Sequence, residues 1–171
     1  MKKDCCFTND QHWFRYRAAG LVIENGKALF VTDSTLDYCY TAGGGVHMGE
    51  KAEDCVRREL KEGTGVDYEI DHLAVICENF FDGHGGSLEG MDCHCLELYF
   101  LMKSTGIMNT GSVSVNADGN REKLVWIPID DIEQYNIKPS FLKNRMREIA
   151  GGTGILHIVT EADRNPARKE E

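Results

Sequence analysis

The sequence lacks an excess of basic residues, which bears on what the protein can bind. Lysine and arginine total 19, against 28 aspartate and glutamate residues, and the formal net charge is −9. Non-specific binding to a nucleic acid polymer needs a basic surface, so we expect none here. A small polyanion is still compatible with this charge where a cation or a local arginine cluster offsets the repulsion.

The sequence also lacks long apolar runs and a recognisable secretion signal. Its longest apolar runs have only the length of a strand, so we expect no membrane span. The first ten residues, MKKDCCFTND, contain no apolar core of the kind found in signal peptides. The whole chain has seven cysteines, an odd number. We therefore expect reduced thiols and a cytoplasmic protein.

No internal repeat and no interdomain linker interrupts the 171 residues. This length suits one domain with a core of its own. We predict a single domain over residues 1–171, with the core at about 13–150 and loose tails at 1–10 and 161–171.

Apolar and β-rich segments outnumber helical ones. Strands are predicted at 13–24, 27–33, 38–41, 68–81, 93–102, 123–129 and 155–160, and helices at 51–62, 130–135 and 140–150. Asn25-Gly26 predicts a hairpin turn, because both central positions of that turn need a positive φ. Gly63 and Gly65 are expected to end the first helix. The pattern predicts an α/β fold with a mixed sheet covered by helices.

The helix at 51–62 carries a carboxylate where packing does not need one. Ala52, Cys55, Val56 and Leu60 form an apolar stripe at helical spacing, and Glu59 projects into that stripe. A carboxylate aimed at the core is costly unless something pairs with it. The alternative is a common amphipathic helix whose charges are only solvated.

Glu62 lies near enough to Glu59 on the helix for both carboxylates to reach one ion. The two charges repel each other without a cation, and Mg²⁺ commonly uses a few carboxylates together with substrate phosphates. The run Gly43-Gly44-Gly45 precedes this helix. Glycines let backbone carbonyls meet a cation and backbone amides meet phosphate oxygens. The stretch therefore indicates a phosphate and metal site.

The segment from Gly44 to Val66 resembles the Nudix box, G-x5-E-x7-R-E-U-x-E-E-x-G-U, in which U is a bulky aliphatic residue. Gly44 opens it, Glu50 follows after five residues, and Arg58-Glu59 follow after seven more. The end of the box reads Leu60-Lys61-Glu62-Gly63-Thr64-Gly65-Val66. Every defined position matches except Gly63, which replaces the second glutamate of the E-E pair.

The resemblance implies a Nudix-type α/β/α sandwich with a mixed sheet, spanning about residues 13–150. It also implies a Mg²⁺-dependent hydrolase, with Mn²⁺ as an alternative metal. The expected substrate is a small nucleoside diphosphate derivative, cleaved at its diphosphate bond. Some Nudix proteins are homodimers, so a dimer is a further possibility. The roles implied by position are catalysis and metal binding for Glu59 and Glu62, metal binding through the carbonyl of Gly44 or Gly43, and a structural ion pair for Glu50 and Arg58. The amides of Gly43 and Gly45 are candidates for substrate binding.

Gly63 leaves the activity open, because glycine supplies no side-chain oxygen. Another acid replaces the missing ligand, or the enzyme works slowly with fewer ligands, or catalysis is lost and binding remains. The last case predicts a nucleotide-binding or sensor module. Glu97 is a candidate replacement for the missing ligand. The resemblance makes Glu122 a candidate base or metal ligand, and both glutamates have a simple alternative as strand residues.

Other candidates lie outside the box. Arg15 and Arg17 share one face of a strand, and are either a diphosphate clamp or an exposed edge. Cys93-His94-Cys95 has the composition of a metal site, but no CxxC pair completes it. Several aromatic residues are candidates for stacking a base or for the core, and the sequence does not separate these two roles: Trp13, Phe14, Tyr38, Tyr40, Phe80 and Phe81.

Overall fold

The structure is a computed structural model that describes residues 3–84, 86–109, 111, 114–115 and 119–164. Its strands are β1 (Cys6–Asn9), β2 (His12–Leu21), β3 (Ile23–Glu24), β4 (Lys27–Thr32), β5 (Gly43–Gly45), β6 (Ile70–Asp82), β7 (Asp92–Met102), β8 (Lys123–Pro128) and β9 (Leu156–Thr160). Its helices are α1 (Ala52–Thr64), η1 (Gly86–Leu88), η2 (Ile129–Gln134) and α2 (Phe141–Gly151).

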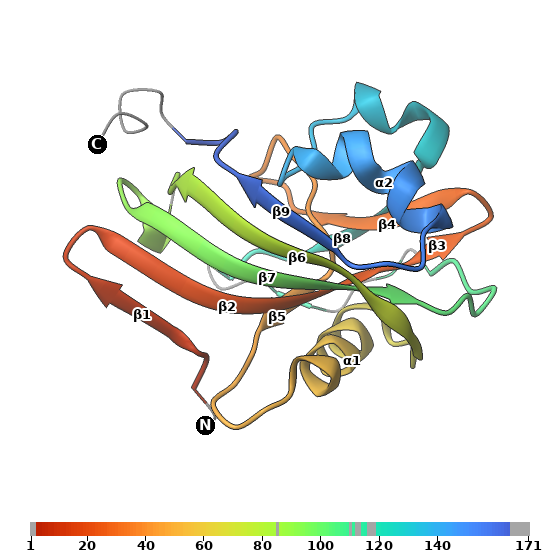
Figure 1. The fold of residues 1–171 in the computed structure, drawn as a ribbon, viewed down its shortest axis with the longest axis horizontal. Coiled ribbons are helices and arrows are strands. Elements are labelled where there is room, and N and C mark those ends of the chain that lie inside the picture. Colours follow the sequence, from red (N-terminus) through yellow and green to blue (C-terminus); the bar gives the residue numbers. More distant parts are fainter. Residues whose placement is uncertain (1–2, 85, 110, 112–113, 116–118, 165–171) are drawn as a thin grey trace.

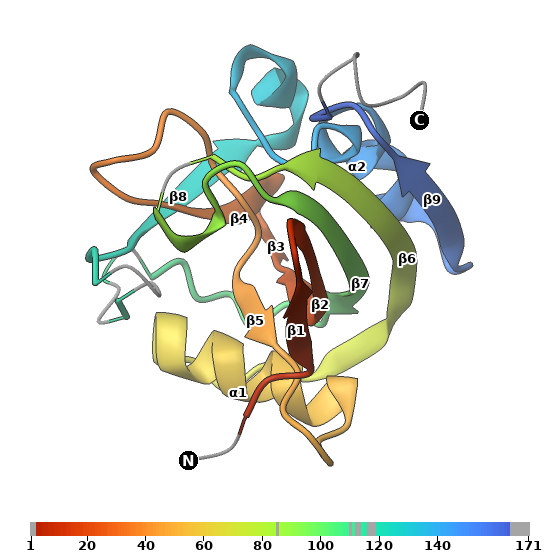
Figure 2. The same cartoon turned by 90° about the vertical axis from the view of Figure 1, so that its left-hand side faces the viewer.

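The larger sheet is mixed, as the sequence predicts. Its strand order is β1-β2-β7-β6-β9, and β5 pairs with β2 off this path. β2 runs parallel to β7, whereas β6 runs antiparallel to β7. A second sheet has the order β3-β4-β8. The helices α1 and α2 lie on opposite sides of these sheets (Figure 1 and Figure 2). The predicted α/β sandwich with a mixed sheet is confirmed.

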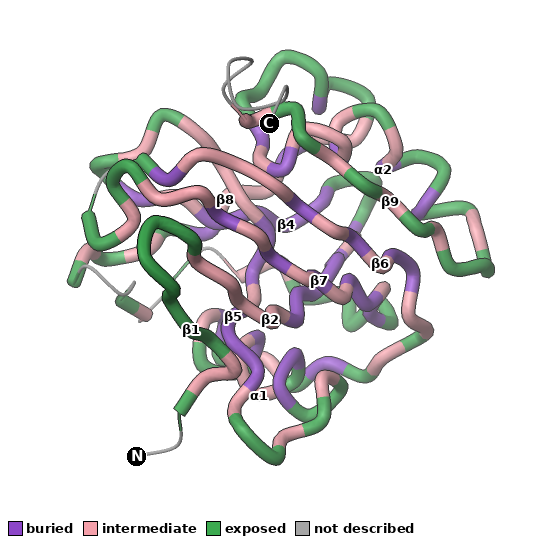
Figure 3. The backbone as a smooth tube through the Cα atoms, turned by 60° about the vertical axis from the view of Figure 1, so that its left-hand side comes forward, coloured by how far each residue is buried: buried purple, intermediate pink, exposed green. Residues whose placement is uncertain are grey.

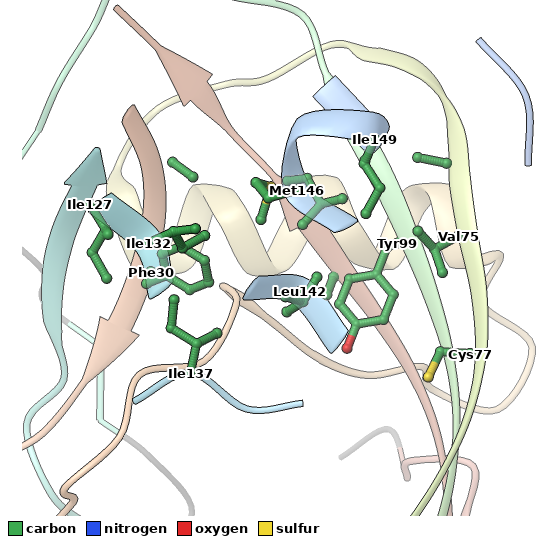
Figure 4. Packing of buried hydrophobic residues seen from close by; sticks show 14 residues of the cluster. Phe30, Val75, Cys77, Tyr99, Ile127, Ile132, Ile137, Leu142, Met146 and Ile149 are labelled. Atoms are coloured by element: carbon green, nitrogen blue, oxygen red, sulfur yellow. The ribbon is translucent and has the colours of Figure 1, made fainter. Parts of the chain in front are cut away.

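Each long helix packs against its own hydrophobic cluster. On the side of α2, Leu142, Met146 and Ile149 pack with Tyr99 and Phe30 (Figure 4). On the side of α1, the buried residues Val56 and Leu60 belong to a cluster that also contains Ala18, Val22 and Phe100.

The side chains of β2 alternate between these two clusters. Ala19 and Leu21 belong to the cluster with α2, whereas Ala18, and Val22 directly after the strand, belong to the cluster with α1. Successive side chains of a strand point to opposite faces. Nearer the start of β2, the same alternation places Trp13, Arg15 and Arg17 on one face of the strand and Phe14 and Tyr16 on the other.

Helix α1 extends two residues beyond the predicted end. Gly65 adopts a left-handed conformation with φ 75°, and its amide donates to the carbonyl of Lys61. It thus ends the helix by the αL capping geometry that glycine favours. Gly63 lies inside the helix, so the expectation that Gly63 stops it is wrong. One glycine is tolerated there because it costs only about 1 kcal/mol and the apolar face of the helix is buried.

The predicted hairpin turn is present, since Asn25 and Gly26 have φ values of 50° and 73°. Within the stretch 1–10, which we expected to be loose, Cys6–Asn9 forms the edge strand β1, exposed along its length (Figure 3). Of the expected C-terminal tail, Arg164 donates to Asp92 over 2.8 Å. Residues 165–171 lie outside the described residues.

Within the described residues, no helix has the length and apolar character needed to cross a membrane.

Candidate active site

The glycine turn and helix α1 meet at Gly44 and Glu59. Strand β5 pairs with β2, which places Gly44 opposite Ala18. A Cβ atom built on Gly44 would lie 2.4 Å from the carboxylate carbon of Glu59. Only glycine leaves room for that carboxylate. The glutamate in the apolar stripe therefore lies against the backbone of the turn.

Arg58 connects this carboxylate to the start of the box. Its Nε and Nη2 atoms donate to the two carboxylate oxygens of Glu50 over 2.9 and 3.0 Å. The backbone amide of His47 donates to the same Glu50 carboxylate over 3.0 Å. The hydrogen bonds from Arg58 have the largest effect on this carboxylate. Together with the bond from His47 they outweigh burial and lower the pKa of Glu50 to about 2. The Arg58–Glu50 ion pair therefore connects the loop before α1 to the helix itself.

Arg58 also contacts the two candidate metal ligands. Its Nη1 atom lies 2.5 Å from Glu59 Oε1 and 3.6 Å from Glu62 Oε2. The side chain of Glu59 is 23% exposed and that of Glu62 is 61% exposed. Both therefore reach solvent on the cavity side of the helix. The resemblance implies an ion pair of Arg58 with Glu50 alone, so the guanidinium has a wider set of partners than expected.

The donor atoms at this place suit a hard cation. Glu59 and Glu62 offer carboxylate oxygens, and Gly44 lines the same cavity with its backbone. Mg²⁺ prefers oxygen ligands and usually keeps several waters, so a small protein donor set fits it. In the described part of the chain, no three His, Cys, Asp or Glu residues cluster closely enough to hold a metal ion.

No carboxylate fills the position of the missing glutamate in the described structure. A Cβ atom on Gly63 would meet only Ser114 Oγ, at 3.8 Å. Glu97, the candidate replacement, is 4% exposed and accepts hydrogen bonds from Arg17, Asn79 and Tyr99. This carboxylate is held within the sheet.

Glu122, the candidate base or metal ligand, lies nearer to Gly63. It accepts hydrogen bonds from Ser114 Oγ and, over 2.6 Å, from the hydroxyl of Tyr40. Burial and this carboxylate raise the pKa of Tyr40 well above its usual range, so the hydroxyl stays a donor. Glu122 and Gly63 line one cavity. The Tyr40–Glu122 pair was not anticipated, because its members are far apart in the sequence.

Both arginines of β2 line the cavity beside the glycine turn. Arg17 donates to the carbonyl of Thr41 over 2.6 Å and lies 3.5 Å from Glu97. Arg15 lies 3.2 Å from Asp4. Asp4 was also unexpected, because nothing in the polar N-terminal sequence distinguishes it. The two arginines are therefore held in place by acidic or carbonyl partners at the cavity wall.

The cavity has a volume of about 820 Å³. The residues brought together at its acidic end are Gly43, Gly44, Gly45, Glu59, Glu62 and Gly63. Its walls also hold four of the six candidate aromatic residues: Trp13, Tyr38, Tyr40 and Phe81.

The Cys93-His94-Cys95 segment does not form a metal site. Cys93 and Cys95 are buried on one face of β7. The ring of His94 lies on the other face, stacked on Phe80 with a centroid distance of 4.3 Å. Alternation along the strand separates the thiols from the imidazole.

Comparisons with known proteins agree with this architecture. The structure is similar to a MutT protein of Bacillus halodurans, with a TM-score of 0.63 and 16% identity over 87% of this chain and 92% of that one. It is also similar to a MutT protein of Methanosarcina mazei Go1 (TM-score 0.59, 13% identity, 84% of this chain and 96% of that one). An ADP-ribose pyrophosphatase of Streptococcus suis 89-1591 has a TM-score of 0.53 and 14% identity, covering 85% of this chain and 98% of that one. These similarities show a shared fold.

By sequence, no curated protein matches this chain. The model of the NUDIX domain, in contrast, matches residues 14–149, which include the glycine turn, helix α1 and both sheets except β1, β9 and the start of β2. The match covers most of the chain, and Gly44, Glu59 and Glu62 of the box line one cavity in the structure. This chain therefore belongs to the Nudix family.

Proposed function

We propose that this chain is a Mg²⁺-dependent pyrophosphohydrolase that cleaves a diphosphate bond in a nucleotide or a nucleotide-linked substrate. One observation carries the proposal: Glu59 and Glu62 line the same cavity as Arg15, Arg17 and the glycine turn Gly43–Gly45. Two carboxylates suit a cation, and two guanidinium groups suit phosphate oxygens. A metal–diphosphate complex needs both kinds of partner.

Glu59, Glu62 and the carbonyl of Gly44 would hold the metal, with Mn²⁺ as an alternative to Mg²⁺. When bound, the ion neutralises negative charge on the diphosphate as the bond to phosphorus breaks. Arg58 and Glu50 would act only as positioning residues, because their contacts hold the loop and the helix together.

The reaction would join the oxygen of a water molecule to one phosphorus atom and break that atom's bond to the bridging oxygen. The bridging oxygen leaves with the second phosphoryl group. Glu59 or Glu62 would accept the proton from the attacking water. Arg15, Arg17 and the amides of Gly43 and Gly45 would orient the diphosphate.

A second candidate function is a nucleotide-binding or sensor module with little turnover. Gly63 favours it, because an added Cβ there would meet only Ser114 and no described carboxylate occupies that space. Losing even an indirect metal contact costs 10- to 100-fold in affinity or activity in known sites, so roughly that loss is expected here.

Several further properties belong to this proposal. The resemblance in fold to an ADP-ribose pyrophosphatase supports a small nucleotide-derived substrate. The formal net charge of −9 argues against a nucleic acid polymer as partner. A cytoplasmic location and a homodimer remain proposals.

Phosphate and nucleotide release with Mg²⁺ over a panel of nucleoside diphosphate derivatives tests the two functions. We expect wild-type turnover that Glu59→Gln lowers by at least tenfold. Glu53→Gln is the matched control, since Glu53 is an exposed acid of the same helix. A second readout is the Mg²⁺-induced rise in the melting temperature, which Glu59→Gln should abolish.

The Gly63→Glu variant decides between the candidates. A silent wild type that binds nucleotide and gains turnover only with Gly63→Glu would contradict the enzyme proposal and support the binding module. If wild type turns over the substrate and the Glu59→Gln variant does so at the same rate, the site assignment is wrong.

A further inference from the structure

The cavity extends well beyond the acidic end. Besides Glu59 and Glu62, it is lined by Trp13 of β2, Phe81 of β6 and Tyr38. A volume of about 820 Å³ lies in the range of pockets that enclose a whole small-molecule ligand, roughly 300–1,000 Å³. The aromatic end therefore has room for a part of the ligand other than the diphosphate.

Strand register gives the distance between the two ends. Arg17 pairs with Gly45 of the glycine turn, and Trp13 lies four residues earlier on the same strand. At about 3.3 Å per residue, the two levels are about 13 Å apart. Trp13 and Phe81 both pair with Cys93 of β7, so they lie at the same level on either side of that strand. A ligand with phosphates near Gly45 thus meets two aromatic side chains at one level.

The neighbouring aromatic residues behave differently. Phe14 and Phe80 lie on the opposite face of the sheet, where both rings contact His94 with centroid distances of 5.3 and 4.3 Å. None of these four rings belongs to the two hydrophobic clusters described above, and of the four only Trp13 and Phe81 line the cavity. Both are half-buried at the cavity. Because side chains alternate along β2 and β6, one aromatic residue of each adjacent pair, Trp13 or Phe81, lines the cavity.

Tyr38 forms part of another wall at this end of the cavity. The ammonium of Lys138 lies 5.3 Å from the centroid of its ring and 3.5 Å from Asp163, and all three residues line the cavity. These contacts hold the ring of Tyr38 in place. The aromatic end is therefore built from three separate segments of the chain.

We propose that Trp13 and Phe81 bind the aromatic ring of the substrate, a nucleobase, and so favour nucleoside diphosphates over diphosphates that lack a base, while the glycine turn and Glu59 hold the diphosphate. The proposal rests on the proposed function, because it takes the diphosphate end from it. Base–aromatic stacking contributes about 1–3 kcal/mol per base and accepts any base. The sugar spans the distance between the two levels.

Binding measurements with two kinds of probe test the proposal: inorganic diphosphate, and the 5′-diphosphates of adenosine, guanosine, cytidine and uridine. With Mg²⁺ present, we expect wild type to bind at least one nucleoside diphosphate more tightly than inorganic diphosphate. Trp13→Ala and Phe81→Ala should each weaken that binding by about fivefold or more. Both variants should leave inorganic diphosphate binding within twofold of wild type.

Phe14→Ala and Phe80→Ala are the matched controls, because each removes the adjacent aromatic ring from the opposite face. They should leave the affinity for both kinds of probe unchanged. Equal effects of all four variants, or equal wild-type affinity for inorganic diphosphate and every nucleoside diphosphate, would overturn the inference and leave the proposed function standing. A chain that binds no diphosphate overturns the proposed function as well.

Tryptophan fluorescence gives a readout that does not depend on removing a cavity side chain. The chain has two tryptophans. Trp126 donates its indole N–H to the carbonyl of Asn109 over 2.8 Å and packs against the cluster of α1. In a Trp126→Phe variant, emission from Trp13 should be quenched by the preferred nucleoside diphosphate and unaffected by inorganic diphosphate. No change with either ligand would contradict stacking on Trp13.

Discussion

The carboxylate of Glu59 lies where a side chain of Gly44 would begin, 2.4 Å from the Cβ position of that glycine. The contact joins helix α1 to the strand that pairs with β2. Gly44 is therefore a steric requirement of the site, in addition to offering its carbonyl. The position of Glu59 therefore depends on the absence of a Cβ atom at Gly44.

Gly44→Ala should displace Glu59 from the turn. Overpacking of this kind costs about 1–3 kcal/mol. We expect a lower free energy of unfolding and at least a tenfold weaker Mg²⁺ response. Denaturant unfolding and a Mg²⁺ titration followed by melting temperature measure the two effects. An unchanged Mg²⁺ response would show that Glu59 does not need this contact.

Gly63→Ala should have the opposite effect on stability. Its Cβ atom would meet only Ser114 Oγ, at 3.8 Å, and the residue lies inside α1. Replacing a helical glycine by alanine stabilises by about 0.5–1 kcal/mol. Urea unfolding should show a higher midpoint with an unchanged slope. A lower midpoint would indicate that the loop containing Ser114 packs closely against this turn.

Glu50 should make stability depend on acidic pH. Its pKa is about 2 in the folded protein, because Arg58 hydrogen-bonds the carboxylate, against an ordinary value of 4.5. The unfolded chain therefore binds more protons between these values, and the stabilising contribution is fully present above pH 4.5. It is lost as pH falls towards 2.

Urea unfolding of wild type and Glu50→Gln between pH 3 and pH 7 measures this contribution. The variant should lose about 1.5–3 kcal/mol at neutral pH, the cost of a hydrogen bond to a charged group. The difference from wild type should shrink on acidification. Glu53→Gln, on the exposed face of the helix, should follow the wild-type curve. A constant difference across the range would exclude Glu50 as the titrating group.

Leu60→Ala should destabilise the protein through loss of packing between α1 and β2. Leu60 is fully buried, and a Cβ atom on Gly20 would lie 2.6 Å from its Cδ1 atom. Truncating a buried leucine costs about 2–5 kcal/mol. Val159→Ala, at a side chain that is 59% exposed, is the control and should change stability by less than about 0.5 kcal/mol. Similar losses in both variants would contradict the packing argument.

The sequence predicted elements well where local chemistry decides them. Asn25-Gly26 makes a turn because both residues accept a positive φ. Gly65 caps α1 for the same reason. Gly63 was expected to end the helix but lies within it, because one glycine costs too little to break a helix whose apolar face is buried. Burial of Val56 and Leu60 outweighs that cost.

Contacts between distant segments could not be predicted. Tyr40 and Glu122 are 82 positions apart and meet in one hydrogen bond. Nothing in their sequence neighbourhoods favours that partner. Trp13 and Phe14 are adjacent and both aromatic, so only the direction of each side chain separates a cavity residue from one that stacks on His94.

By itself the sequence determined the mixed α/β class, the glycine turn before helix α1 and the position of Glu59 on the apolar side of that helix. These follow from periodicity and from the conformational freedom of glycine, which are local properties. Only the tertiary structure decided that Gly44 makes room for Glu59, that Glu97 is held by Arg17 within the sheet, and that Trp13 faces the cavity. Strand register decides these, because pairing of distant segments sets which side chains share a face.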